Sequence, residues 1–412
     1  MALVNMRDML YHAYRHRYAV GAFNPAGLDV LEGVMDAAER CRAAVILSLA
    51  EAQAEHLDFE LLLPAVEAAA QRATVPVAIE LDRGSSIESA VWAIRLGFNA
   101  ITVDASREPL FDHIDRTRSV VEMGRACGVP VGAALGDVPG LEGEDTALPS
   151  AASAHTGVAA VKAFVERTGV DFLTVSTGVA PARGQGEPKW DGHRLEQIHA
   201  ALGLPLAIDV DPGLDEGGFR RLSAHGVSKI NHCTALADGA GEFMEGDRHG
   251  SSPQGYTGPD KAVRGAIGVE TERCMRAWDS AGRAAEILAQ CRGWFPVEHL
   301  IVYNVVGISE HQVQTMMAEG RRRLANIPGV RSVTTGRAVK DDARYRYAWL
   351  VRFVHPAVID SYREHPDHVA FADSLFRPVA GDRISIDYQL VVSGPGDAAF
   401  AGDPSARGGG PL

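Results

Sequence analysis

Eight short apolar, β-branched runs alternate with amphipathic stretches of helical period between residues 18 and 232. Parallel strands need a crossover connection, usually a helix, so this alternation predicts a parallel sheet. Eight such units predict an α/β fold, a closed (β/α)8 TIM barrel. A doubly wound open sheet is the alternative, but the count of eight and the lack of GxGxxG after the first run count against it. The runs are YAVGAF (18–23), AAVILSL (43–49), VPVAIEL (75–81), NAITV (99–103), VPVGAAL (129–135), DFLTVS (171–176), LPLAIDV (204–210) and VSKINH (227–232).

The pattern changes near residue 293, where strand-like and helix-like stretches follow one another in a new order. Strands are predicted at 297–306, 330–339, 345–354 and 384–392, and helical stretches at 309–327 and 356–376. Four strands with helices on one face predict a small α+β, ferredoxin-like domain. We therefore divide the chain into a barrel at 1–292, a second domain at 297–392 and a disordered tail at 393–412.

Bulk composition excludes several classes of function. The net charge is −13 and no long basic run occurs, which argues against nucleic-acid binding. No apolar run is long enough to cross a bilayer, and the first twenty residues lack the apolar core of a signal peptide, so we expect a cytoplasmic protein without a membrane partner. The five cysteines form no CxxC pair and no regular spacing, which argues against a disulfide framework or a zinc ribbon.

The stretch VAIELDRGSS (77–86) supplies the strongest catalytic candidate. Asp82 closes the third run, and barrel enzymes carry their reactive groups at the carboxyl ends of strands. A carboxyl group there can act as a general acid and base; alternatively, it pairs with Arg83 or caps the next helix. Asp209 and Asp211 follow the seventh run with the spacing that places both on one face. They can bind Mg²⁺ weakly, receive an amine or pair with Arg83 and Arg183, and we favour the pairing.

Longer sequence words resemble a known family. GAFN (21–24), LDRGSS (81–86), GVDFLTVSTG (169–178), GEPKWD (186–191), VSKIN (227–231) and SAGRA (280–284) resemble the class II, metal-dependent ketose-bisphosphate aldolases, which include the fructose-bisphosphate aldolases. The likeness runs through the first 290 or so residues. HLIV (299–302), IPGV (327–330) and HPDHVAF (365–371) resemble the Dabb, or stress-responsive A/B barrel, domain.

The aldolase resemblance implies a zinc ion held by three histidines, yet this sequence has none of them. Arg83, Pro181 and Asp209 stand at the three positions, and an arginine cannot ligate zinc. The phosphate-binding positions also differ, since Asp211 and Pro212 replace small residues of a glycine-serine turn and Ala182 replaces a glycine. We therefore expect neither zinc nor a bisphosphate substrate.

Some family positions remain unchanged. The resemblance makes Asp82 the proton-transfer residue and leaves five residues as candidates for orienting or binding a small-molecule substrate. They are Asn24, Asp104, Lys189, Asn231 and Thr234. Lys229, on the face of Asn231, is a Schiff-base candidate or a structural cation, and we favour the structural role. His232 and Cys233 are a weak candidate for a thiol with an adjacent imidazole, because neighbours on a strand face opposite ways.

The Dabb resemblance implies a second set of candidates. A plant polyketide cyclase of that family works without a cofactor through a tyrosine and a histidine, which match Tyr362 and His368 here. His299 lies on the first predicted strand of this domain, and His365 opens the HPxH motif. A phenol can hold an oxyanion while an imidazole takes a proton; alternatively, the histidines only fix the helix end. The family also implies a homodimer or a higher homo-oligomer, formed through one face of the sheet.

Three hypotheses follow. The first is a zinc-independent aldolase-like lyase or condensing enzyme of specialised metabolism that acts on a small carbonyl or imine substrate. In it Asp82 is the acid and base, Arg83 and Arg183 hold an anion or oxyanion, and Asn231 orients the substrate. The second is a non-catalytic barrel with a dimerising or cyclase-like second domain. The third, an ordinary fructose-bisphosphate aldolase, fits the missing histidines least well.

Overall fold

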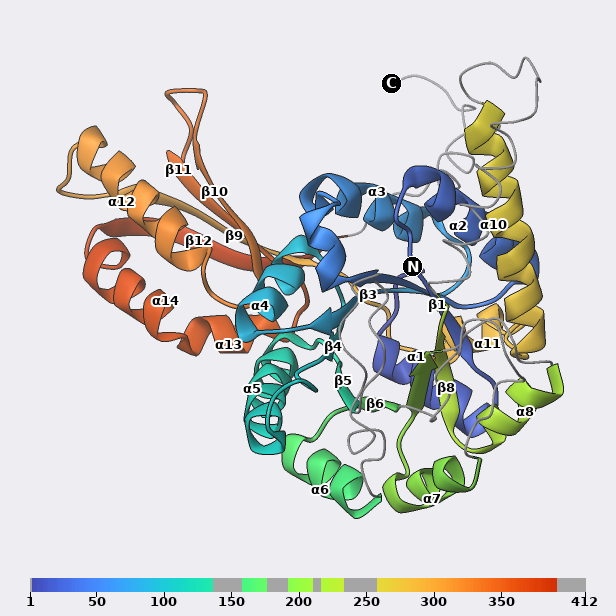
Figure 1. Ribbon diagram of the computed structural model, residues 1–412. Coiled ribbons are helices and arrows are strands. Elements are labelled where there is room, and N and C mark those ends of the chain that lie inside the picture. The colour runs from blue at the N-terminus through green and yellow to red at the C-terminus, as the bar shows by residue number, and fades with distance from the viewer. Residues whose placement is uncertain (1, 136–157, 176–191, 210–215, 233–257, 391–412) are drawn as a thin grey trace.

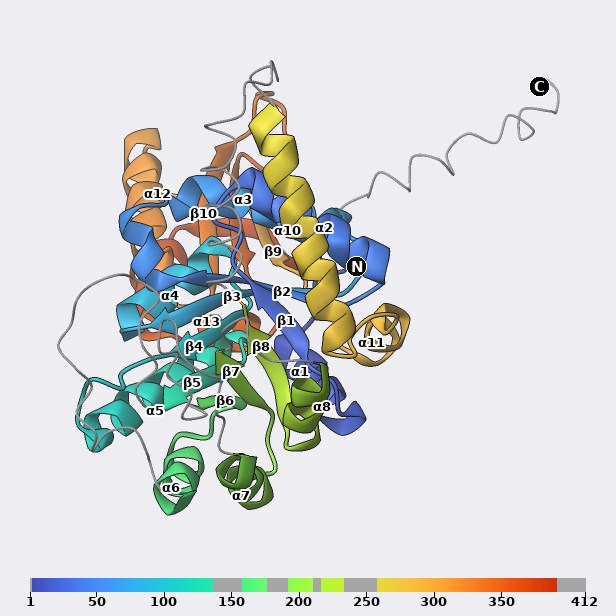
Figure 2. The same ribbon diagram turned by 45° about the vertical axis from the view of Figure 1, so that its right-hand side comes forward.

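The computed structural model describes residues 2–135, 158–175, 192–209, 216–232 and 258–390. The eight predicted runs form eight parallel strands in a closed barrel ordered β1 to β8, which confirms the TIM-barrel prediction (Figures 1 and 2). The strands are β1 (Val20–Phe23), β2 (Val45–Ala50), β3 (Val77–Gly84), β4 (Ala100–Val103), β5 (Val131–Leu135), β6 (Phe172–Val175), β7 (Leu206–Asp209) and β8 (Val227–Asn231).

Helices surround the barrel because each amphipathic stretch buries its apolar side against the strands. They are α2 (Leu28–Cys41), α3 (Phe59–Arg72), α4 (Ile87–Leu96), α5 (Leu110–Cys127), α6 (Val158–Thr168), α7 (Gly192–Leu202), α8 (Glu216–Ala224), α10 (Gly258–Ala277) and α11 (Ala284–Gln290). Helix α10 runs beside α2 along one side of the barrel. No helix of the described segments is long and apolar enough to cross a membrane.

Helix α1 (Met6–His16) precedes the first strand and closes the amino-terminal end of the barrel. Its Met6, Met9 and Leu10 are buried in one cluster with side chains from β1 to β4 and β6. The helix begins at Asn5, whose side chain accepts a hydrogen bond from the Asp8 amide. Because this end is filled by packed side chains, the chemistry is left to the opposite end, where the strands terminate.

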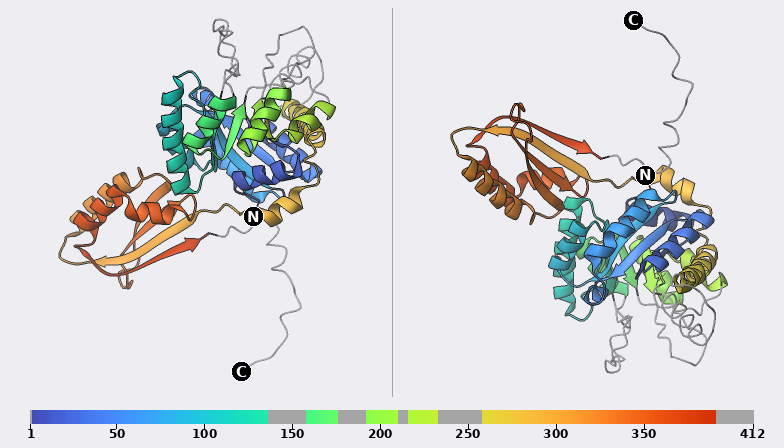
Figure 3. Two further views of the ribbon diagram at one scale, coloured as in Figure 1. Left: turned by 90° about the horizontal axis from the view of Figure 1, so that it is seen from below. Right: turned by 90° about the horizontal axis from the view of Figure 1, so that it is seen from above.

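The second domain is a four-stranded antiparallel sheet of order β10-β11-β9-β12, with its helices on one face (Figure 3). This arrangement confirms the predicted α+β fold. Its elements are β9 (Val297–Val305), α12 (Glu310–Leu324), β10 (Val330–Arg337), β11 (Tyr347–Phe353), α13 (Val358–Glu364), α14 (Pro366–Phe371), a π-helical turn (Ala372–Phe376) and β12 (Ala380–Gln389). The predicted tail at 393–412 lies outside the described residues.

The helical stretch predicted at 356–376 is not one continuous helix. His365 adopts an extended backbone with ψ of 133°, so α13 ends before it and α14 begins after it. The cause is Pro366, because the residue before a proline is driven away from helical geometry. The break changes the direction of the chain between Tyr362 and His368.

The two domains contact each other through the helices on one side of the barrel. Arg331 of β10 forms a two-pronged ion pair with Glu67 of α3, with an Nη1 to Oε1 distance of 2.6 Å. The Ser361 hydroxyl of α13 donates to the Ala126 carbonyl of α5 at 3.2 Å, and His355 stacks on Trp294 of the connecting segment. The interface therefore combines an ion pair, a hydrogen bond and aromatic packing.

Candidate active site

Strand β3 ends in an irregular turn that presents two charged side chains in succession. The register against β4 shifts between Leu81 and Gly84, and Arg83 has a φ of 55°, in the left-handed region. The strand therefore runs to Gly84 rather than stopping at Leu81, where the predicted run ends. A non-glycine residue in this region is held there by its surroundings, and such strain is typical of functional sites.

The Arg83 guanidinium bridges two carboxylates at the carboxyl end of the barrel. Its Nη1 donates to Asp104 Oδ2 at 2.9 Å and its Nη2 donates to Asp209 Oδ2 at 2.9 Å. Asn231 donates from Nδ2 to the other oxygen of Asp209 at 2.8 Å. Residues from β3, β7 and β8 and the end of β4 thus meet in one polar network, as the predicted pairing of Arg83 with Asp209 requires.

Asp82 lies beside this network and is almost fully buried, at 2% exposure. Its Oδ2 is 3.9 Å from Arg83 Nε, beyond hydrogen-bond distance. Burial raises the pKa of Asp82 to about 7, although the positive charges of Lys229 and Arg83 oppose the shift. A carboxyl group with this pKa can both give and accept a proton near neutrality.

A second, deeper charged cluster supports Asp82 from inside the barrel. Lys229 Nζ is 2.7 Å from Glu80 Oε1, and both side chains are wholly buried. Glu80 also accepts hydrogen bonds from Ser48 and Thr102, so its oxygens have partners. Burial alone would lower the pKa of Lys229, but the carboxylates of Glu80 and Asp82 outweigh it and raise the pKa. A lysine held as an ammonium ion is a poor nucleophile, which favours the structural role over a Schiff base.

Sequence reasoning missed Glu80, although a signal was present. A glutamate in the middle of the apolar run VAIEL points into a barrel core, and a buried glutamate needs a cationic partner. The buried Lys229 is that partner.

The remaining substrate-binding candidates are only partly described. Asn24, at the end of β1, donates from Nδ2 to Gln53 Oε1 at 2.6 Å, while its own Oδ1 is buried without a partner among the described residues. Asp104 also accepts from the Ser106 hydroxyl and amide. Four candidates lie outside the described residues: Arg183, Lys189, Asp211 and Thr234. Pro181, where the resemblance implies a second zinc-binding histidine, also lies outside them.

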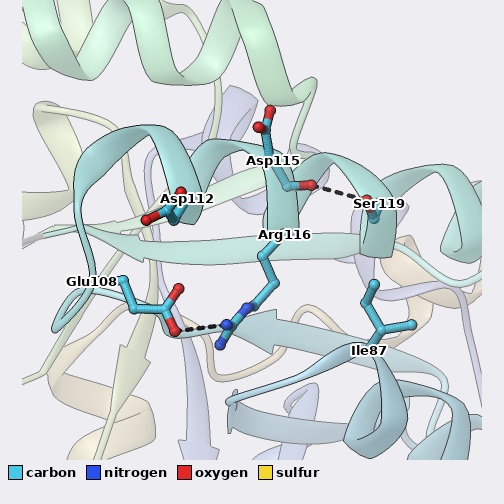
Figure 4. A pocket seen from close by; sticks show the side chains of 6 residues that line it. All are labelled: Ile87, Glu108, Asp112, Asp115, Arg116 and Ser119. Carbon is cyan, nitrogen blue, oxygen red and sulfur yellow. Dashed lines mark hydrogen bonds and ion pairs between the residues drawn. The ribbon is translucent and has the colours of Figure 1, made fainter.

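An open depression of about 650 Å³ is lined by one face of α5 and by Ile87 at the start of α4 (Figure 4). Arg116 crosses it, pairing with Glu108 at 2.6 Å and donating to the Ser85 carbonyl at 2.5 Å. Asp112 and Asp115 also line it, but neither Asp82 nor Arg83 does. Its chemistry is that of a surface ion-pair network that fixes the turn after β3.

His232, the residue after β8, has partners that the sequence did not suggest. Its Nε2 is 3.2 Å from Glu270 Oε1 and 3.5 Å from Cys274 Sγ, both on α10. The candidate partner Cys233 lies outside the described residues. Glu270 and Cys274 were missed because they follow His232 by 38 and 42 residues in a helix that carried no recognised motif.

In the second domain, three of the four candidates come together. The Tyr362 and His368 rings lie 4.4 Å apart between centroids, and the His299 ring is 6.1 Å from Tyr362. His299 Nδ1 is 2.7 Å from Asp387. His365 instead accepts a hydrogen bond from the Asp367 amide at 3.2 Å and caps α14, which is the helix-end role.

Comparisons with known proteins agree with this architecture. Residues 4–283 match the family model "Fructose-bisphosphate aldolase class-II", and residues 298–390 match "Stress responsive A/B Barrel Domain". The chain belongs to the class II fructose-bisphosphate aldolase family. A fructose-bisphosphate aldolase of Geobacillus stearothermophilus is 33% identical over 293 residues, which cover 69% of this chain and 100% of the relative. One of Staphylococcus epidermidis is 32% identical over 291 residues, with coverage of 69% and 100%.

Solved aldolase structures superpose on the barrel. The YdjI aldolase from Escherichia coli K12 is 27% identical with a TM-score of 0.61, covering 68% of this chain and 99% of its own. A putative fructose-1,6-bisphosphate aldolase from Coccidioides immitis is 25% identical with a TM-score of 0.59, covering 68% and 97%. The similarity spans whole aldolase chains, and the second domain is an addition to them.

Membership in a metal-dependent family raises the question of whether this barrel mouth fits zinc. At the first of the three positions where the resemblance implies a zinc-binding histidine, Arg83 places a guanidinium, which has no lone pair to donate. At the third, Asp209 already accepts hydrogen bonds from Arg83 and Asn231. The described residues of the barrel mouth therefore do not fit the family's zinc ion.

Proposed function

We propose that the barrel is a zinc-independent aldolase-like enzyme that makes or breaks a carbon–carbon bond next to a carbonyl or imine group. The observation that carries the proposal is the position of Arg83. A fixed positive charge stands at the position where the aldolase resemblance implies the first zinc-binding histidine, beside a carboxyl group whose pKa burial raises to about 7.

Asp82 is assigned the proton transfer. It is buried at the carboxyl end of β3, and burial raises its pKa to about 7. General acid–base catalysis is most efficient when the pKa of the group lies near the working pH. Asp82 would take a proton from the carbon next to the carbonyl group and return it in the reverse direction.

Arg83 is assigned the stabilisation of the negative charge that develops on the substrate oxygen. Two of its nitrogens are engaged by Asp104 and Asp209, whereas its Nε donates no hydrogen bond to the described residues and faces Asp82. Nε and Asp82 Oδ2 are 3.9 Å apart, so a substrate oxygen at hydrogen-bond distance from both would bridge them. An enolate oxygen at that position would receive a charge-assisted hydrogen bond.

The local charge favours the substrate class. Among the described residues of the mouth, Arg83 contributes one positive charge, Asp104 and Asp209 together contribute two negative charges, and the Lys229–Glu80 pair cancels. This described part of the mouth disfavours a phosphate dianion and favours a neutral or amine-bearing molecule. A guanidinium also polarises a carbonyl less than a metal ion does, so we propose a substrate with an acidic carbon or an imine.

The test measures how fast the proton on the carbon next to the carbonyl group exchanges with solvent. This exchange requires the proton-transfer step but not the making or breaking of a carbon–carbon bond. A panel of small ketones, aldehydes and amino-carbonyl compounds is incubated with the chelator-treated protein in deuterated water, and deuterium incorporation is measured by NMR. We expect exchange with at least one compound, lowered about 100-fold or more in Asp82→Asn. Asp115→Asn, an exposed carboxylate on α5, is the matched control and should keep the full rate. Exchange that is unchanged in Asp82→Asn, or that is abolished by chelation and restored by zinc at the barrel mouth, would refute the proposal.

The second domain offers a second candidate activity, a cofactor-free cyclase-like step at Tyr362 and His368. His368 Nδ1 lies 3.0 Å from the Arg363 carbonyl, which can only accept, so Nδ1 carries the proton and Nε2 keeps its lone pair. Burial lowers the pKa of His368 and raises that of Tyr362, which leaves a neutral base beside a neutral phenol. An activity lost in His368→Ala but kept in Asp82→Asn would place the chemistry in this domain, with the exposed His311→Ala as control.

A further inference from the structure

We propose that His232, Glu270 and Cys274 bind a divalent cation of the zinc class in tetrahedral geometry, with a water molecule as the fourth ligand. This site is built from residues other than those of the barrel mouth. It joins the end of β8 to α10.

The fold brings three different metal-binding side chains to one point. Glu270 and Cys274 are one helical turn apart on α10, so both project from the same face of the helix. His232 follows the last residue of β8, and its ring packs against Phe23 and Trp278 with centroid distances of 6.0 and 5.7 Å. The aromatic packing holds the imidazole with Nε2 directed at α10.

The distances between the three donor atoms match one face of a tetrahedral zinc site. Zinc bonds of about 2.1 Å to nitrogen or oxygen and about 2.3 Å to sulfur, at tetrahedral angles, separate neighbouring donors by about 3.4–3.6 Å. Here Nε2 to Sγ is 3.5 Å, Sγ to Glu270 Oε1 is 3.5 Å, and Nε2 to Oε1 is 3.2 Å. A metal ion would need only small side-chain shifts.

The charges of the site also suit a divalent cation. A Glu270 carboxylate and a Cys274 thiolate together neutralise one M²⁺ ion. The metal complex then has no net charge, which lowers the desolvation cost of placing it in a nearly buried site. The thiol proton leaves to solvent as the metal–sulfur bond forms. Hydrogen bonds from Arg273 hold the pKa of Glu270 well below its usual range, so this ligand is ionised at neutral pH.

Arg273 is the one described group that competes with a metal here. Its Nη2 donates to Glu270 Oε1 at 2.6 Å, and its Nε donates to Oε2 at 2.8 Å. When Oε1 binds a metal, the Nε bond to Oε2 can remain and orient the carboxylate. Such an outer hydrogen bond to a ligating carboxylate is common in metal sites.

The burial of Cys274 argues against a role for its thiol as a catalytic nucleophile. Cys274 is buried, and burial raises the pKa of its thiol, so a free thiolate does not form at neutral pH. Glu270, by contrast, keeps 28% of its side chain exposed, which gives a metal ion and its water a path from solvent. The geometry points to a cation that stabilises the contact between α10 and the barrel.

The test uses the full chain after removal of metal by chelator dialysis. Cobalt(II) is titrated as a spectroscopic probe, because a cobalt–thiolate bond gives a near-ultraviolet charge-transfer band and tetrahedral cobalt gives visible bands. Zinc affinity is then measured by competition. We expect one equivalent of cobalt with both sets of bands, and a rise in the unfolding temperature when zinc is added.

Variants assign the signal to the three residues. Cys274→Ser should abolish the charge-transfer band, and both it and His232→Gln should weaken zinc binding more than about 100-fold, beyond the cost of outer-shell changes. Cys41→Ser, another buried thiol, is the matched control and should behave as the parent chain. Absence of one-equivalent binding, or a band that survives in Cys274→Ser, would overturn the inference. The Cys274→Ser chain also separates the two proposals. If proton exchange in this variant still requires zinc, the zinc that supports exchange lies at the barrel mouth and not at the site on α10.

Discussion

Replacing Arg83 by methionine keeps much of the side-chain volume and removes the charge that joins β3 to Asp104 and Asp209. The change breaks two hydrogen bonds of 2.9 Å and leaves two carboxylates close together. Removal of one partner from a buried ion pair costs about 3–5 kcal/mol. Asp104 and Asp209 keep 15% and 25% of their side chains exposed, so solvent screens part of this loss. We therefore expect a decrease of about 2–3 kcal/mol in the free energy of unfolding.

A double-mutant cycle with Asp209→Asn tests the physical reason. Asparagine keeps the oxygen that accepts from Asn231 but removes the negative charge that Arg83 compensates. The second substitution should therefore recover about 1–2 kcal/mol in the Arg83→Met background, although it destabilises the parent chain. Urea denaturation followed by far-ultraviolet circular dichroism measures all four chains, and equal m-values are required for the comparison.

Two outcomes would refute this reasoning. Additivity of the two substitutions within about 0.5 kcal/mol would mean that Arg83 and Asp209 are not coupled. A loss no larger than that of Arg118→Met, which breaks an exposed pair with Asp115, would mean that the network contributes as little as an ordinary surface ion pair.

Three further predictions concern other parts of the molecule. Because the folded-state pKa of Asp82 is about 7 and its ordinary value is 3.8, the folded state binds more protons between these values. The parent chain should thus lose roughly 2–3 kcal/mol of stability relative to Asp82→Asn as the pH rises from 5 to 8, and a constant difference in urea midpoints would contradict this. Ile384, Ile386 and Tyr388 are exposed on one face of β12, so Ile386→Asp should turn a dimer into a monomer in sedimentation experiments, whereas a monomeric parent chain would remove the basis for this expectation. Gly320→Ala places a Cβ 2.4 Å from the Trp349 ring and should destabilise the second domain by about 1–3 kcal/mol in thermal unfolding, with an unchanged transition showing that the ring can move aside.

The barrel was predictable because its eight strands are local events. Each apolar run and each amphipathic helix can be recognised from a pattern of about ten residues, and the repetition of these units predicts a closed parallel sheet. The position of Asp82 at a strand end followed in the same way. The second domain was predictable strand by strand, but the break at Pro366 was overlooked although the proline is visible in the sequence.

The site contacts were harder to predict because they depend on closure of the barrel. Asp104 reaches Arg83 from the end of the next strand, β4, whereas Asp209 reaches it from β7, 126 residues away, and only the pairing with Asp209 was anticipated. Glu80 and Lys229, 149 residues apart, meet across the interior. Cys274 meets His232 only because α10 packs against α2 and β1, and no pattern within either segment indicates that contact.

The amino-terminal segment has a consequence for how the chain is made. The Asn5 amide donates to the Arg292 carbonyl, the Trp294 amide donates to the Leu3 carbonyl, and Arg292 pairs with Asp8. These residues thus find their partners only when the junction between the domains, 284 residues beyond Asp8, has left the ribosome. A truncated barrel that ends before Trp294 would lose some of the hydrogen bonds that hold the segment covering the amino-terminal end of the barrel. An excised barrel domain should therefore be cut after this residue.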